Sequence, residues 1–197
     1  MITAHKLDEA LFMQTPNHGG KLTDPSYIVV HYTAGRSAAS SAKWLCNPKA
    51  RASAHLVIGR DGTLIQLANF ATVTWHAGQS EWNGVHGLNN HSIGIELDSC
   101  GPVARVNGRW RSLSLGTDYV DGDVVELAHA NGGPVRGWLL YSQTQLAMVE
   151  DICRELIAEY PTIIDILGHD QIAPGRKLDP GPAFPMDVIR SKLFGRE

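Results

Sequence analysis

The segment from Gly168 to Phe184 combines a histidine, a lysine and an aspartate with residues that restrict or free the backbone. Its sequence, GHDQIAPGRKLDPGPAF, holds three prolines and three glycines. This composition is typical of a loop shaped to hold side chains in place. His169 and Asp179 in this loop are both residue types that bind zinc. Two ligands do not make a metal site, so a third must come from elsewhere in the chain.

A third candidate ligand, His31, ends the apolar run at residues 27–31, which predicts a buried β-strand. Taken alone, a histidine in this position is more typical of a satisfied core residue. Together with His169 and Asp179 it makes a set of two imidazoles and one carboxylate. That set leaves the fourth tetrahedral position of zinc to water, which is the arrangement of catalytic rather than structural zinc.

A carboxylate that could work beside such a metal lies in the predicted strand at residues 92–98. Alternation places Glu96 on one face with Ser92 and Gly94, opposite the apolar side chains of the run. Alternation alone leaves open whether Glu96 is an ordinary exposed acid or a base in a cleft. In the second case Glu96 could take the proton of a zinc-activated water, and Lys177 could stabilise the developing oxyanion.

The composition is that of a folded, soluble domain. The chain has 197 residues, of which 43% are apolar and 19% charged, so it is long enough to bury a core as one domain. A net charge of −3 provides no basic surface, and nucleic acid is therefore not an expected partner. No apolar run approaches the roughly 18 residues of a membrane span, so no membrane partner is expected.

The first residues and the cysteines indicate a compartment. Residues 1–10 carry acidic side chains and no long apolar core, unlike a signal peptide, which predicts a cytoplasmic location. Cys46, Cys100 and Cys153 are odd in number and contain no close pair. This pattern favours free thiols in a reducing compartment.

Apolar periodicity and turn residues predict the elements that position these side chains. Residues 1–26 are interpreted as an N-terminal arm, and residues 27–197 as a single α/β domain with a central mixed β-sheet flanked by helices. The weak pattern at about residues 99–140 predicts an insertion, with a tight turn at 106–110 and a hairpin at 119–125. The other predicted strands are 27–31, 53–59, 63–67, 92–98, 138–141 and 163–167, and the predicted helices are 37–47, 142–160 and 186–194.

Five stretches in order along the chain carry a family resemblance. They are VVH at 29–31, SAH at 53–55 with RDG at 60–62, WHAG at 75–78, SIGIEL at 92–97, and the loop at 168–184. The chain resembles the zinc-dependent N-acetylmuramoyl-L-alanine amidases of type 2, a superfamily that includes the peptidoglycan recognition proteins. Within it the chain is most similar to the cytosolic recycling amidases that act on 1,6-anhydro-muropeptides.

This resemblance implies a role for each candidate residue. It implies one zinc ion per chain, with His31, His169 and Asp179 as its ligands. It implies Glu96 as the general acid/base and Lys177 as the group that stabilises the tetrahedral intermediate. Residues expected to contact substrate are Tyr32, Trp75, His76 and Arg176, whereas His55 is expected to be structural or to line the cleft.

The resemblance also implies the reaction, which is hydrolysis of the amide between N-acetylmuramic acid, or its 1,6-anhydro form, and L-alanine of the stem peptide. Expected partners are peptidoglycan fragments or muropeptides, and the expected state is a monomer. Two alternatives stay open. One is a phage-type endolysin that acts on polymeric wall after release by a holin-type route, and the other is a non-catalytic peptidoglycan-binding module.

The sequence differs from the recycling enzymes in two respects, so both free muropeptide and polymeric wall are considered as substrates. The insertion at 99–140 lengthens the chain between the strand of Glu96 and the helix expected at 142–160. The sequence YTAGR at 32–36 is closer to phage and secreted members.

Overall fold

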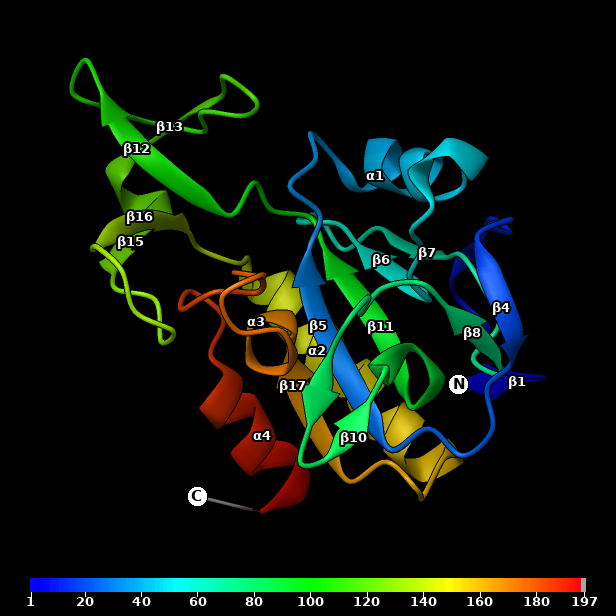
Figure 1. Cartoon of the computed structure of the whole chain (residues 1–197). Helices are drawn as coiled ribbons and strands as arrows, with labels where there is room; N and C mark the ends of the chain where they lie inside the picture. The colour runs from blue at the N-terminus through cyan, green and yellow to red at the C-terminus, as the bar shows by residue number, and fades with distance from the viewer. Residues whose placement is uncertain (196–197) are drawn as a thin grey trace.

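A six-stranded mixed sheet forms the centre of the computed structural model, which describes residues 1–195 (Figure 1). The strand order is β17 (Asp165–Gly168), β5 (Tyr27–Tyr32), β11 (Ser92–Leu97), β6 (Leu56–Ile58), β7 (Leu64–Gln66) and β3 (Leu11–Phe12). The first four strands in this order are parallel, β7 runs antiparallel to β6, and β3 runs parallel to β7. The predicted α/β class with a central mixed sheet is therefore confirmed.

One face of this sheet carries the main apolar core. Ile28 of β5 and Ile93 of β11 are fully buried there, against Val149 and Leu156 of helix α2 (Gln143–Glu159). The second helix in the same core is α4 (Met186–Phe194). Burial of this continuous aliphatic layer is the largest stabilising contribution that the sequence offers.

Helix α2 begins as its sequence predicts. Ser142 accepts a hydrogen bond from the backbone N–H of Gln145, and the Gln145 side chain accepts one from the N–H of Ser142. This reciprocal capping box satisfies two backbone donors that the first turn leaves free. The predicted range of 142–160 differs from the observed helix by one residue at each end.

The opposite face of the sheet is covered only in part. Helix α1 (Ala38–Leu45) packs over β6 and β7, and the segment at residues 77–88 packs over Tyr27 and Val29 of β5. The carboxyl ends of β5 and β11 lie between these two covers. Because side chains alternate along a strand, His31 of β5 shares this face with Tyr27 and Val29.

Short elements connect these layers. Four strands form small two-stranded sheets beside the core, namely β8 (Thr72–Thr74) with β4 (His18–Lys21), and β9 (Glu81–Trp82) with β10 (Val85–His86). Three short helical turns are η1 (Pro48–Ala50), η2 (Leu88–Asn90) and α3 (His169–Ile172). The predicted helix at 37–47 is observed as α1, which begins one residue later and ends two residues earlier than predicted.

The predicted N-terminal arm packs closely on the rest of the chain. Strands β1 (Ile2–Thr3) and β2 (Lys6–Leu7) pair with each other, and β3 adds the last strand to the central sheet. Leu7 and Leu22 are buried in the main core. The boundary at residue 26 stays a prediction, and residues 196 and 197 of the predicted 27–197 domain lie outside the described residues.

The segment predicted as an insertion forms a second sheet of five antiparallel strands. Their order is β14 (Asp118–Tyr119), β13 (Arg109–Arg111), β12 (Pro102–Val106), β16 (Arg136–Leu139) and β15 (Val124–Leu127). The predicted tight turn at 106–110 is confirmed. Asn107 and Gly108 both have positive φ, of 50° and 78°, as a two-residue turn between twisted strands requires.

The predicted hairpin at 119–125 is wrong. Strands β14 and β15 lie at opposite edges of the second sheet, and the helical turn η3 (Asp121–Asp123) connects them. Tyr119 pairs instead with Trp110, and Val125 pairs with Trp138. A local hairpin would have paired Tyr119 with Val125, whereas the observed sheet gives each of them an indole ring as its cross-strand partner, and cross-strand pairs with an aromatic ring stabilise a sheet.

Two further expectations concern the whole chain. Cys46, Cys100 and Cys153 are free thiols, as predicted. Among the described residues, none of the helices combines the length and the hydrophobicity needed to cross a bilayer.

Candidate metal centre

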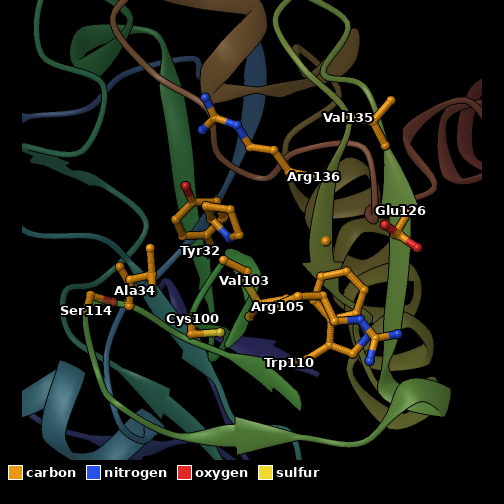
Figure 2. A pocket seen from close by; sticks show the side chains of 14 residues that line it. Tyr32, Ala34, Cys100, Val103, Arg105, Trp110, Ser114, Glu126, Val135 and Arg136 are labelled. Atoms are coloured by element: carbon orange, nitrogen blue, oxygen red, sulfur yellow. The ribbon is translucent and has the colours of Figure 1, made fainter. Parts of the chain in front are cut away.

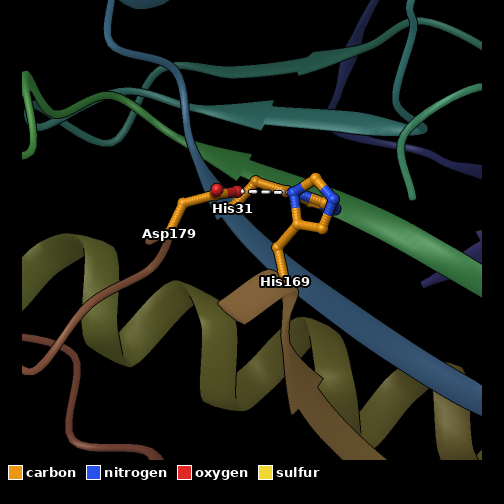
Figure 3. Close-up of side chains that lie close together, drawn as sticks. All are labelled: His31, His169 and Asp179. Carbon is orange, nitrogen blue, oxygen red and sulfur yellow. Dashed lines mark hydrogen bonds and ion pairs between the residues drawn. The ribbon is translucent and has the colours of Figure 1, made fainter. Parts of the chain in front are cut away.

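Three side chains from separate elements meet at one end of the parallel strands. His31 is the fifth residue of β5, His169 directly follows the neighbouring strand β17, and Asp179 comes from the loop after α3 (Figure 3). The Nδ1 atoms of the two histidines are 2.8 Å apart, and each is 2.9 Å from Oδ2 of Asp179. Within residues 1–195 this is the one group of three such side chains that could hold a metal ion.

All three side chains are buried, which sets their charge. His31 is 1% exposed, and burial lowers its pKa to about 4, with the charge of His169 acting in the same direction. Burial raises the pKa of Asp179, but the adjacent imidazole rings of His169 and His31 outweigh this and hold the pKa below its ordinary value. At neutral pH the group therefore contains an ionised carboxylate and a neutral His31.

The surroundings of His169 fix which of its nitrogens carries the proton. Nε2 of His169 lies 3.1 Å from the carbonyl oxygen of Ala77. A carbonyl oxygen only accepts, so Nε2 must donate, and in the neutral ring this leaves a lone pair on Nδ1. That lone pair points at Asp179 and His31.

A chain of hydrogen bonds fixes the proton of His31 in the same way. The Ser92 hydroxyl donates to the carbonyl oxygen of Leu88 at 2.5 Å, so its oxygen is free to accept from Nε2 of His76 at 3.3 Å. Nδ1 of His76 then accepts from Nε2 of His31 at 3.0 Å. Burial holds the pKa of His76 well below its ordinary value, so its ring is the neutral one this chain requires. Nδ1 of His31 is left as a lone pair.

Two imidazole lone pairs and one carboxylate oxygen therefore converge on a single point. None of these three atoms carries a proton to share, so a cation satisfies all of them at once. Two histidine nitrogens and one carboxylate oxygen, each histidine held by a hydrogen bond at its other nitrogen, form a ligand set that suits zinc. The residues present thus fit the predicted metal.

Glu96 lies directly beside this group. It is the register partner of His31 on the adjacent parallel strand, which puts both side chains on the same face of the sheet. The pKa of Glu96 is raised to about 8, mainly by burial and also by the charge of Asp179, while the charge of Lys177 acts in the opposite direction. Oε2 of Glu96 is buried and has no hydrogen-bond partner among the described residues. Of the two open interpretations, the structure favours a carboxylate that faces a cleft.

The metal group and Glu96 open into a cleft of about 500 Å³. Lys177 lines it as a half-buried side chain that forms no ion pair with any residue of the described range. Lys177 lines the same cleft as Glu96 and His31, and its positive charge lowers the pKa of both. A cation there can stabilise negative charge that develops on a substrate.

The four residues predicted to contact substrate all line the same cleft, namely Tyr32, Trp75, His76 and Arg176. Two of them also have structural contacts. Arg176 donates to the carbonyl oxygens of Ala77 and Gln79 at 2.7 and 2.6 Å, and His76 takes part in the hydrogen-bond chain to His31. Contact with substrate stays a prediction for all four.

His55 was expected either to be structural or to line the cleft, and its contacts are structural. It is fully buried, its Nδ1 accepts from the N–H of Gly94 at 3.0 Å, and its Nε2 donates to the carbonyl of Thr72 at 2.8 Å. These bonds tie β11 to the strand β8. The residue takes no part in the metal group.

Sequence reasoning misses two supports of the site. Alternation places Ser92 on the face of Glu96, but nothing in the sequence indicates that it orients His76. His129 of the insertion lies 3.0 Å from the carboxylate of Asp170, and Asn131 donates to the carbonyl oxygen of Asp170 at 2.9 Å. The insertion therefore braces the loop that carries His169 and Asp179, a long-range contact with no local signal.

Comparison with known proteins agrees with this geometry. The chain belongs to the N-acetylmuramoyl-L-alanine amidase family, whose model matches residues 21–182. It is 36% identical over 142 residues to the 1,6-anhydro-N-acetylmuramyl-L-alanine amidase AmpD of Salmonella typhimurium strain SL1344, which covers 72% of this chain. The match spans 57% of the length of that relative.

Two solved structures share the fold over nearly the whole chain. A selenomethionine derivative of AmpD has a TM-score of 0.68 and 26% identity, covering 98% of this chain and 99% of its own. The amidase AmiD from E. coli, solved with anhydro-N-acetylmuramic acid-L-Ala-D-gamma-Glu-L-Lys, has a TM-score of 0.65 and 25% identity. That match covers 98% of this chain and 63% of the AmiD chain.

Proposed function

We propose that this protein is a zinc-dependent N-acetylmuramoyl-L-alanine amidase that cleaves muropeptides between the lactyl group of N-acetylmuramic acid, or its 1,6-anhydro form, and L-alanine. The observation that carries the proposal is the position of Glu96, whose Oε2 has no hydrogen-bond partner among the described residues and which lies beside three side chains that could hold a metal. Family membership and the substrate named for AmiD support the choice of bond. We take the anhydro-muropeptide with the stem L-Ala-D-γ-Glu-L-Lys as the model substrate.

In this proposal zinc, held by His31, His169 and Asp179, would supply a Lewis acid and lower the pKa of water in the cleft. Glu96 accepts a proton from the attacking water and delivers it to the amide nitrogen, which leaves as the amine of L-alanine. Lys177 donates a hydrogen bond to the carbonyl oxygen as negative charge develops on it. Oε2 of Glu96 is buried, and the side chain lines the cleft, so the proton can pass directly between water and substrate there.

The test supplies anhydro-muropeptide and intact sacculi side by side to the zinc-loaded protein, with products read by mass spectrometry. Release of free stem peptide from the anhydro-muropeptide supports the proposal. Release from sacculi alone would instead support the endolysin alternative. Binding of either substrate without any release would support the non-catalytic module and refute the amidase.

We further propose that the protein acts as a monomer on peptidoglycan fragments in the cytoplasm, with release to the wall as the alternative. The buried metal group draws all its ligands from one chain, so a single copy suffices for the chemistry. Light scattering at micromolar concentration tests the monomer, and cell fractionation tests the location.

A further inference from the structure

A second cavity, of about 670 Å³, lies between the insertion and the end of β5 (Figure 2). Two of its residues, Tyr32 and Ala34, also line the cleft of the metal group. All the others come from residues 100–137. The two hollows thus adjoin at Tyr32, which directly follows His31.

The wall between the two hollows forms where the Tyr32 ring packs closely against the backbone at the start of the insertion. The ring of Tyr32 lies against Gly101, where a Cβ would be 2.6 Å from the ring and where φ is +73°. A larger residue at position 101 would push the Tyr32 ring away, so the start of the insertion is shaped to the end of β5. The cavity has the size of a small-molecule site.

The Trp110 ring in the cavity has no free face. Arg105 lies 4.2 Å above this ring and pairs with Asp121 at 2.8 Å. The ring also lies against Gly137, where a Cβ would be 2.6 Å away, and the residue is 4% exposed. Trp110 therefore offers no open face on which a sugar ring could stack.

Two charged side chains in the cavity remain without partners. Arg136 and Glu126 are both exposed, and neither forms an ion pair or hydrogen bond with any described residue. Arg136 extends toward Tyr32, on the side of the catalytic cleft, whereas Glu126 lies on the far side of the cavity (Figure 2). A ligand that enters past Tyr32 meets a positive charge first and a negative charge second.

The stem peptide of the proposed substrate carries the complementary charges in this order. A glutamate linked through its γ-carboxyl keeps a free α-carboxylate, and the lysine that follows carries an ammonium group. We propose that this cavity is the subsite for the stem peptide beyond L-alanine, with Arg136 pairing the glutamate carboxylate and Glu126 pairing the amine of the third residue. The inference rests on the proposed function, because it takes its substrate from there.

The test measures binding as well as turnover, so that it does not depend on catalysis. The ligands are anhydro-N-acetylmuramyl-L-alanine and its extension by D-γ-Glu-L-Lys. Binding is measured by calorimetry on zinc-loaded Glu96→Gln protein, and turnover on protein with Glu96 intact. Arg136→Gln should weaken binding of the extended ligand by about tenfold and raise its KM to match, with kcat unchanged. The short ligand should be unaffected.

Two controls sharpen the result. Glu126→Gln should weaken only ligands with an amine on the third residue, and should have no effect when norleucine replaces lysine. Arg109→Gln removes an exposed arginine of the same insertion that lies outside this cavity, and should change neither ligand. An equal loss for both ligands, or no loss for either, would overturn the subsite. If Arg136→Gln weakened binding of the extended ligand as expected but the protein with Glu96 intact showed no turnover, the amidase would be refuted and the subsite supported.

Discussion

Glu96 and His31 are register partners on the neighbouring parallel strands β11 and β5, so their side chains extend from the same face of the sheet. Oε2 of Glu96, which has no hydrogen-bond partner among the described residues, and the imidazole of His31 therefore project side by side from the sheet. In the proposed mechanism the spacing of the two strands, rather than a flexible loop, sets the distance between the acid/base and the metal, which favours precise positioning. The loop at 168–184 then adds the other two proposed ligands and Lys177.

The hydrogen-bond chain from Leu88 through Ser92 and His76 to His31 should control metal affinity. Ser92→Ala removes the acceptor that fixes the His76 proton, and zinc affinity should fall by about 10- to 100-fold. Competition with a chromogenic chelator measures the loss. Nitrogen-15 NMR of the histidines should show His31 protonated on Nε2 in the native protein and a tautomer mixture in the variant.

Ser92→Thr keeps the hydroxyl and should restore both zinc affinity and the NMR signature. If Ser92→Ala bound zinc as tightly as the native protein, the hydrogen-bond chain would have no part in the site.

The stability of the metal-free protein should depend on pH through Glu96. Its folded pKa is raised to about 8 from an ordinary value of 4.5, so the folded state holds a proton that the unfolded state has already lost. Stability should therefore fall between these pH values, by up to about 1.4 kcal/mol per pH unit, and level off outside them. Glu96→Gln should abolish this fall and be the more stable protein at pH 8.

Urea denaturation of both proteins in chelator, at several pH values from 4 to 9, measures the difference. Parallel pH profiles for the two proteins would show that Glu96 is not held in an environment that opposes its ionisation.

The contact between His129 and Asp170 should hold the metal loop in place. Both side chains are largely buried, at 5% and 13% exposure, so His129→Ala should cost about 2–4 kcal/mol. Hydrogen exchange should quicken in residues 168–184 although the mutation lies in the insertion. Arg111→Ala is the matched control, because it breaks a solvent-exposed pair with Asp118, and it should change the stability far less than His129→Ala. Unchanged exchange in the loop would contradict the bracing role.

Removal of a single ligand should empty the site. Asp179→Ala leaves two neutral imidazoles without the anionic oxygen, so zinc content should drop well below one ion per chain. Elemental analysis after dialysis against a weak chelator measures it, with Asp187→Asn, which alters an exposed carboxylate outside the metal group, as the control. Full occupancy in Asp179→Ala would remove Asp179 from the ligand set.

The sequence predicts the central sheet and the site residues for a physical reason. Side chains repeat every two residues along a strand, so the alternation along residues 92–98 assigns Glu96 to the face opposite its apolar neighbours. The residue types that bind zinc and the loop that carries two of them then indicate one metal group. In the structure the Nδ1 atoms of His31 and His169 and Oδ2 of Asp179 lie within 2.9 Å of one another.

What could not be predicted depends on contacts distant in sequence. The pairing of Tyr119 with Trp110 overrides a local turn signal, and His129 reaches Asp170 across 41 residues of chain, which is their difference in number. The link between Ser92 and His76 depends on a loop whose path no pattern specifies. Such contacts follow from the packing of whole elements, which local sequence does not encode.

The central claim is that Glu96 is the acid/base of a zinc site that it does not help to build. The most direct measurement is zinc content and muropeptide turnover determined on the same preparation of Glu96→Gln. We predict one zinc ion per chain and turnover reduced by at least about 100-fold. Retained turnover, or loss of the metal together with activity, would contradict the claim.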